Sequence, residues 1–77
     1  MLIGAQVRMA RAAVGWGVRE LAEKAKINPN TVSRIENGGD ALASTLDRIQ
    51  AALEDAGVIF IDRNEDGGPG VRLKDQD

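Results

Sequence analysis

The sequence predicts a mainly α fold, in which a compact four-helix domain is followed by a C-terminal strand or β-hairpin. Apolar residues recur with a period near 3.6 through most of residues 1–57, as on the buried faces of helices. A continuous apolar run at 58–61 then follows a glycine, which is typical of a strand. A chain of 77 residues allows one small core. We expect a helical domain over 1–57, a β extension over 58–74 and a frayed tail over 75–77.

Two apolar stripes predict the first two helices. The first stripe begins near the N-terminus and consists of Ile3, Val7, Ala10 and Val14. The second has the spacing i, i+3, i+4, i+7 and consists of Val18, Leu21, Ala22 and Ala25. Charged residues lie opposite the second stripe, so this helix should bury one face and expose the other.

A third helix has explicit start and stop signals. Asn28 can accept the free amide protons of the first turn, and Pro29 follows at the first helical position, where its missing N–H is not needed. Asn37 and the glycine after it end the helix. A rotation of about 100° per residue places Val32 and Ile35 on the core side. The opposite side carries four polar residues, which are Asn30, Ser33, Arg34 and Asn37.

This polar face has two interpretations. Amide, hydroxyl and guanidinium groups are the side chains that read base edges in the DNA major groove, where Asn bonds adenine and Arg bonds guanine. A solvated surface is the simpler interpretation of one short helix taken alone. The face by itself therefore leaves both open.

The rest of the chain predicts a fourth helix and a hairpin. Leu42, Leu46, Ile49 and Leu53 trace an amphipathic helix that runs from near Asp40 or Ser44 to Ala56 and should cover Val32 and Ile35. The run Val71-Arg72-Leu73 can return antiparallel to residues 58–61. A glycine-rich loop containing Gly67, Gly68, Pro69 and Gly70 would join them.

The strand over 58–61 is apolar on both faces, and one short chain can cover only one of them. We therefore expect the strands of two chains to pair or pack as a dimer. The expected interface consists of Val58, Ile59, Phe60, Ile61, Val71 and Leu73. The alternative is a hairpin that folds back on its own helices, with dimerisation weak or absent.

Four segments together resemble the Cro and phage-repressor (Xre-type) helix-turn-helix family, from roughly Val7 to Leu53. They are Arg11, the run Glu20-Leu21-Ala22, the stretch from Asn28 to Gly38, and the segment from Ser44-Thr45-Leu46 to Ala52-Leu53. The resemblance implies a lambda-repressor-like fold and a transcriptional regulator that binds double-stranded DNA. It also implies roles for single residues. Base edges would be approached by Pro29, Asn30, Ser33 and Arg34, and the phosphate backbone by Asn28, Thr31 and Asn37. Arg11 and Glu36 would form a structural ion pair.

The chain departs from the family pattern at three places. Val18 stands where the family usually has a glutamine that reaches a phosphate, so this contact is left to the backbone amides of Gly17 and Val18. Lys26 stands where a turn glycine is common, and it must adopt a left-handed conformation or reshape the turn. The loop from Gly38 to Ala43 carries no Lys or Arg.

Charge and composition narrow the function. Residues 1–36 carry six Lys or Arg against three Glu, and residues 37–77 carry four against nine acidic residues, so the halves are +3 and −5 within a net charge of −2. A basic half suits phosphate and an acidic half could take a protein partner, although ordinary solubilising charge explains the split as well. The sequence has no Cys and no His. We expect no enzyme, no metal, no cofactor, no membrane segment and a cytoplasmic location.

These observations predict a dimer that places two reading helices about 34 Å apart on a palindromic operator. Repression by occupancy is the default mode, and dual repression and activation is compatible with the same residues. The alternative function is an antitoxin or anti-activator whose C-terminal strand augments a partner's sheet and which may also regulate its own promoter.

Overall fold

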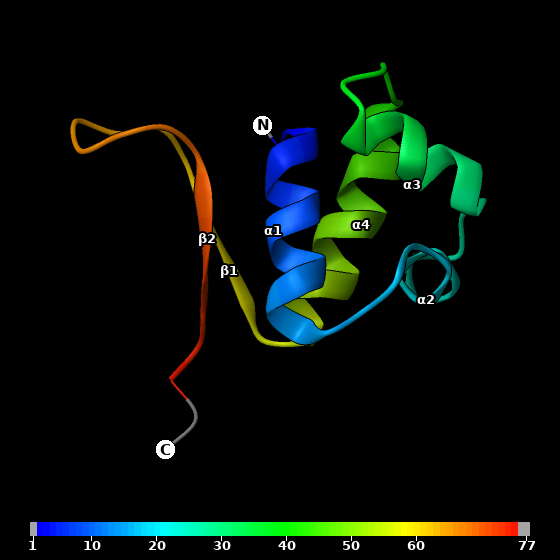
Figure 1. Cartoon of the computed structure of the whole chain (residues 1–77), viewed down its shortest axis with the longest axis horizontal. Coiled ribbons are helices and arrows are strands. Elements are labelled where there is room, and N and C mark those ends of the chain that lie inside the picture. The colour runs from blue at the N-terminus through cyan, green and yellow to red at the C-terminus, as the bar shows by residue number, and fades with distance from the viewer. Residues whose placement is uncertain (1, 76–77) are drawn as a thin grey trace.

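Four helices and one antiparallel hairpin follow each other along the chain in a computed structural model that describes residues 2–75. The elements are α1 (Gly4–Val14), α2 (Val18–Ala25), α3 (Pro29–Glu36), α4 (Ala43–Asp55), β1 (Val58–Ile61) and β2 (Gly70–Leu73). Figure 1 shows the hairpin at one end of the long axis and α2 and α3 at the other. The predicted mainly α fold with a C-terminal hairpin is confirmed.

One core joins the four helices and the hairpin. It contains the side chains of Leu2, Val7, Ala10, Leu21, Ala22, Ala25, Val32, Ile35, Ile49, Leu53 and Val58. Each of the three helical stripes over 1–36 contributes to it as the periodicity predicts. Val14, Val18 and Leu46 are partly buried and pack around its edge. The helix over 43–55 packs mainly against α2, and its Ile49 and Leu53 join the same core as Val32 and Ile35.

Two apolar residues assigned to stripes lie outside their helices. Ile3 precedes α1 with ψ of 162° and is 43% exposed, and Leu2 takes the buried place instead. Leu42 precedes α4 with ψ of 145° and is 74% exposed. Both residues have extended backbone, so helical spacing does not determine which way they face. The predicted stripe was wrong at these two positions.

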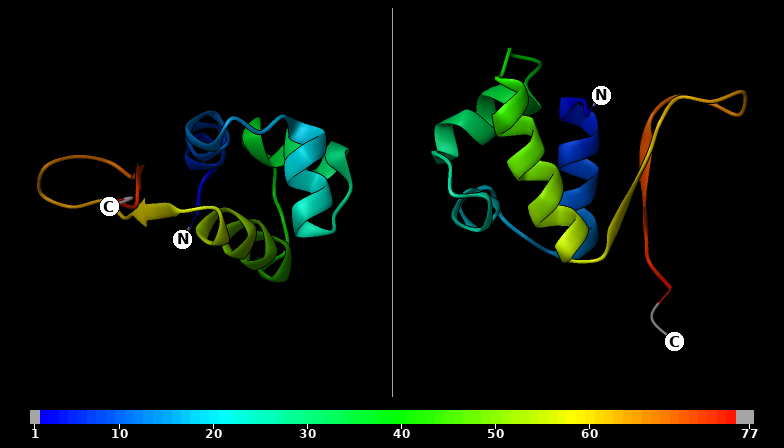
Figure 2. Two further views of the ribbon diagram at one scale, coloured as in Figure 1. Left: turned by 90° about the horizontal axis from the view of Figure 1, so that it is seen from below. Right: turned by 180° about the vertical axis from the view of Figure 1, so that it is seen from behind.

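The hairpin packs against its own helices, which was the alternative interpretation. Val58 pairs with Leu73 and Phe60 with Val71, so these four side chains share one face of the hairpin. Val58, Phe60 and Val71 pack in or against the core on this face, whereas Leu73 is 44% exposed. Val58 is only 1% exposed. It belongs to the core of the single chain, so it is unavailable to a partner in this conformation and the expected interface must be corrected there. Figure 2 shows the hairpin beside α1, with its loop extending beyond the helices.

The other face of the hairpin carries Ile59 and Ile61, both half-buried, together with the exposed Arg72. Within residues 2–75 neither isoleucine is part of the core or packed against it, and the sheet has no third strand. This face is therefore the part of the expected dimer interface that stays accessible. Of the tail expected over 75–77, Asp75 is exposed and follows β2 without regular structure, and residues 76 and 77 lie outside the described part of the chain.

Gln6 holds the hairpin to α1, and sequence reasoning missed it. Its side chain is 1% exposed, its Nε2 donates to the carbonyls of Ile61 and Gly70 at 3.2 and 3.1 Å, and its Oε1 accepts from the Ile3 amide at 3.0 Å. A buried amide with partners for both ends fixes geometry as well as adding stability. This residue sets where the hairpin begins to project from the domain.

Lys26 ends α2 in the left-handed conformation, at φ 60° and ψ 49°. We expect Lys26→Gly to raise the free energy of unfolding by about 1 kcal/mol, because glycine adopts this conformation without the Cβ clash. Chemical denaturation of both proteins measures the change. The matched control is Lys24→Gly inside the same helix, which should lower stability by about 1 kcal/mol. A destabilised Lys26→Gly protein would contradict the strain argument.

Candidate nucleic-acid interface

A tight turn over residues 26–28 joins α2 to α3. The Ile27 amide donates to the Ala22 carbonyl at 3.0 Å, which closes α2, and Asn28 Oδ1 accepts from the Asn30 amide at 2.8 Å, which opens α3. The predicted N-cap is therefore present. The cap uses the oxygen of Asn28 and leaves its NH₂ group free to donate outward.

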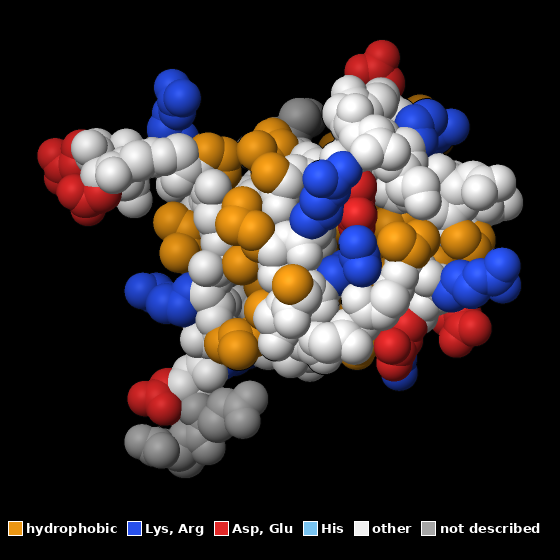
Figure 3. Space-filling view, in the orientation of Figure 1, with side chains coloured by type: hydrophobic (Ala, Val, Ile, Leu, Met, Phe, Trp, Pro, Cys, Tyr) orange, Lys and Arg blue, Asp and Glu red, His pale blue; other side chains and the backbone are white. Residues whose placement is uncertain are grey.

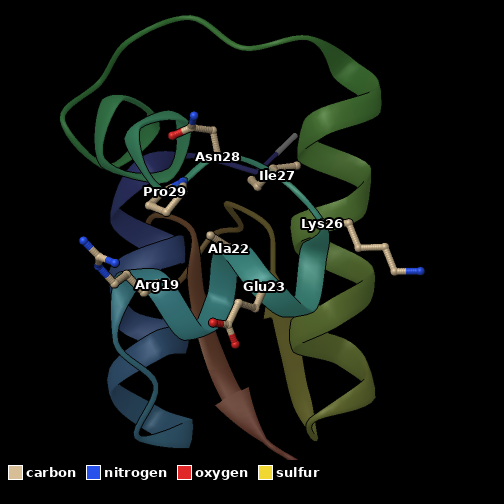
Figure 4. A pocket seen from close by; sticks show the side chains of 7 residues that line it. All are labelled: Arg19, Ala22, Glu23, Lys26, Ile27, Asn28 and Pro29. Atoms are coloured by element: carbon tan, nitrogen blue, oxygen red, sulfur yellow. The ribbon is translucent and has the colours of Figure 1, made fainter.

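An open depression lies between α2 and the start of α3 (Figure 4). It is lined by Arg19, Ala22, Glu23, Lys26, Ile27, Asn28 and Pro29. Figure 4 shows the charged side chains of Arg19 and Lys26 extending away from each other, toward solvent. In residues 2–75 every buried side-chain polar atom has a hydrogen-bond partner, so no buried, unsatisfied group points into this depression. Its shape and chemistry do not favour a small-molecule site.

The outward face of α3 has the composition expected from the sequence. Asn30, Ser33, Arg34 and Asn37 are exposed, Pro29 and Thr31 are half-buried, and Val32 and Ile35 are buried at 0% and 3% exposure. The two buried side chains fix the rotation of the helix about its axis. The four polar side chains therefore form one continuous surface that a partner can reach.

A partly buried ion pair fixes the far end of α3. Arg11 Nε and Nη2 donate to the two carboxylate oxygens of Glu36 at 2.6 and 2.9 Å, and Arg11 Nη1 donates to the Trp16 carbonyl at 3.1 Å. The hydrogen bond to Glu36 and its negative charge raise the pKa of Arg11, against the opposing effect of burial. This ion pair, expected from the family resemblance, ties α1, the segment after α1 and α3 together.

Arg8 is a neighbour of this pair that sequence reasoning missed. Its Nη2 donates to Asn37 Oδ1 at 2.8 Å, and its Nε lies 3.7 Å from Glu36 Oε1. Arg8 precedes Arg11 by three residues, so the two lie on one side of α1. This spacing of three residues was the signal in the sequence that could have placed Arg8 beside the ion pair.

The N-terminus of α2 is open. Gly17 is its N-cap and makes no side-chain hydrogen bond, so the first amides of the helix remain free. Val18 packs against the core and offers only its backbone. A phosphate contact by the amides of Gly17 and Val18 stays a prediction.

Acidic side chains gather at the tip of the hairpin, far from α3 along the long axis (Figure 3). The tip is formed by residues 62–68, where Asp62, Glu65 and Asp66 are all exposed. Among residues 2–75 no group of three or more potential metal ligands comes together. In the same part of the chain, no helix is long and apolar enough to cross a membrane.

Comparison with known proteins identifies a family that the chain matches. A family model described as a helix-turn-helix domain matches residues 2–54, which run from just before α1 through all but the last residue of α4. A comparison with curated proteins returned no match. The matched segment contains every residue of the α3 surface and the ion pair beneath it.

Proposed function

This chain belongs to the helix-turn-helix domain family, and on that premise we propose that it is a sequence-specific transcriptional regulator that binds double-stranded DNA through the major groove. The observation that carries the proposal is the α3 surface, where four polar side chains stand on a helix held from below by Val32 and Ile35. A rigid helix with adaptable hydrogen-bonding groups is what reading of base edges requires.

The proposed base-reading residues are Pro29, Asn30, Ser33 and Arg34. Asn30 can bond adenine bidentately, Arg34 can bond guanine O6 and N7, and Ser33 tolerates several bases. The proposed phosphate contacts are the backbone amides of Gly17 and Val18 with the side chains of Asn28, Thr31 and Asn37. These groups border the α3 surface, as contacts that position a reading helix should.

We further propose that two chains bind one palindromic operator as a dimer, joined through the outer face of the hairpin. The hairpin and α3 lie at opposite ends of a long axis of 32 Å (Figure 1). Two chains joined end to end at their hairpins would hold their α3 helices farther apart than the roughly 34 Å between successive major grooves, so we propose that their long axes meet at an angle that brings both helices to one face of the DNA. Repression by blocking polymerase is the simplest mode for such a dimer.

The test is selection of DNA from a random pool by the purified chain, with its mass in solution measured at the same concentration. A palindromic motif together with a dimeric mass would support the proposal and give the half-site spacing. A folded chain that enriches no sequence would refute it.

Arg34→Ala should weaken binding to the selected site by about 1–3 kcal/mol, because a guanine contact is lost. The loss should fall on one base position in each half-site, measured by binding to sites mutated one base at a time. Arg63→Ala removes the same charge from the hairpin tip and should leave the base preference unchanged. An equal loss on every sequence would instead assign Arg34 to phosphate.

Ile61→Lys should convert the dimer to a monomer, since it places a charge on the outer hairpin face proposed as the interface. Analytical ultracentrifugation measures the change. Leu42→Lys is the matched control, because Leu42 is the most exposed large apolar residue in the described chain and lies far along the sequence from the hairpin. A dimer that survives Ile61→Lys would exclude this interface.

A second candidate function is a protein-interaction module, such as an antitoxin or anti-activator. It is favoured by the two-stranded sheet, in which β1 and β2 each keep one unpaired edge within residues 2–75. Such an edge can accept a strand from a partner. The acidic hairpin tip would then face the partner. A folded chain that enriches no DNA sequence would favour this second function, whereas an enriched motif is compatible with a partner-binding chain that also regulates its own promoter.

A further inference from the structure

We propose that Arg8 on α1 binds a DNA phosphate and, together with Asn37, holds the C-terminal end of the reading helix on the DNA backbone. This inference rests on the proposed function, to which it adds a binding residue on a different helix. Arg8 is outside the α2–turn–α3 unit and was not among the residues expected from the sequence.

The position of Arg8 follows from its bond to Asn37. At about 100° per residue, Asn37 lies between Ser33 and Arg34 in rotation about the α3 axis, in the middle of the outward arc. The Nη2 atom of Arg8 is 2.8 Å from Asn37 Oδ1. The guanidinium therefore lies at the end of the same surface that carries Asn30, Ser33 and Arg34.

The charge of Arg8 remains available there. Glu36 is the only acidic side chain within 4.0 Å of it among the described residues, and both carboxylate oxygens of Glu36 are already hydrogen-bonded to Arg11. The side chain of Arg8 is 56% exposed, against 6% for Glu36. Two arginines and one carboxylate leave a net charge of about +1, and its exposed part is Arg8.

The hydrogen bond also orients Asn37. Because Oδ1 of Asn37 accepts from Arg8, its NH₂ group is left as the outward donor. An arginine has five N–H donors, of which the bond to Asn37 uses one. Arg8 and Asn37 together thus offer a charged fork and a neutral donor side by side, which suits a phosphate oxygen.

Arg34 is the basic residue in the last turn of α3 and is proposed to contact a base, so a further cation at this helix end would favour a phosphate contact for two reasons. The C-terminal carbonyls of a helix repel a phosphate, and a positive charge beside them offsets that repulsion. The loop that follows, from Gly38 to Leu42, contains Asp40 and neither Lys nor Arg. Within the described chain Arg8 is the basic side chain bonded to the residue at this helix end.

The test measures the salt dependence of DNA binding for Arg8→Gln and for Arg63→Gln, which removes the same charge from the hairpin tip. Arg8→Gln should reduce the slope of log K against log salt by about 0.9 for each bound chain, and should weaken binding about tenfold per arginine. The loss should be equal on selected and shuffled DNA. Arg8→Lys should keep the slope of the unmodified chain, and so should Arg63→Gln.

Thermal unfolding of the same proteins separates binding from folding. Arg8→Gln should have the same melting temperature as the unmodified chain, since the Arg8 side chain is largely exposed. An unchanged salt slope in a chain that still binds DNA would overturn the role of Arg8 and leave the proposed function intact. An unmodified chain that binds no DNA would overturn both.

Discussion

Arg11→Met is expected to lower the free energy of unfolding by about 3–5 kcal/mol, because it leaves the carboxylate of Glu36 buried without its partner. Glu36 is 6% exposed and receives both of its short hydrogen bonds from Arg11. The change also removes the donor to the Trp16 carbonyl. Denaturation with urea measures the effect, which is large for a domain of this size.

A control variant and a double variant identify why Arg11→Met is expected to lose stability. Arg19→Met removes an exposed arginine of α2 and should change stability by less than about 0.5 kcal/mol. The double variant Arg11→Met with Glu36→Leu replaces the pair by apolar side chains and should recover much of the loss. In the Arg11→Met variant, the Nε of Arg8 still lies 3.7 Å from the Glu36 carboxylate, so we expect a loss near the lower end of the range of about 3–5 kcal/mol. Equal losses in the single and double variants would show that packing, rather than an unpaired charge, sets the cost.

The sequence predicted those features that depend on neighbours along the chain. Both the N-cap at Asn28 and the turn at Lys26 are local features. The N-cap was found as expected, and Lys26 adopts the left-handed conformation, which was one of the two alternatives for it. The stripe of α2 and the antiparallel return of residues 71–73 were predicted by period and by turn residues. Each of these signals acts over a few residues, where spacing alone determines which side chains meet.

Tertiary contacts were not predictable in the same way. Gln6 looks like an ordinary polar residue of an exposed helix face, and only the folded hairpin gives it the carbonyls of Ile61 and Gly70. Arg8 meets Asn37 from 29 positions away in sequence. The covered face of the hairpin depends on how α1 and α4 are placed, so the sequence left the dimer and the folded-back hairpin as alternatives.

Gly4→Ala should destabilise the chain by about 3 kcal/mol, although alanine is the better helix former by up to about 1 kcal/mol. Gly4 is the first residue of α1 and lies against the end of α3. A Cβ atom there would stand 2.2 Å from the Ile35 carbonyl oxygen and 3.0 Å from Glu36 Cα. Both of these are backbone atoms of α3, so relief requires one helix to move. Denaturation measures the loss of stability.

Gly68→Ala in the hairpin loop is the matched control, because the same added atom meets nothing within 4 Å there. It should leave stability within about 0.5 kcal/mol of the unmodified chain. At Gly4, helix propensity and close packing have opposite effects on the free energy of unfolding of the alanine variant. Helix propensity favours alanine, whereas close packing of α1 on α3 excludes it, so a stabilised Gly4→Ala protein would mean that the two helices separate easily. A destabilised protein would show that α1 and the end of α3 pack too closely at Gly4 to admit a Cβ atom.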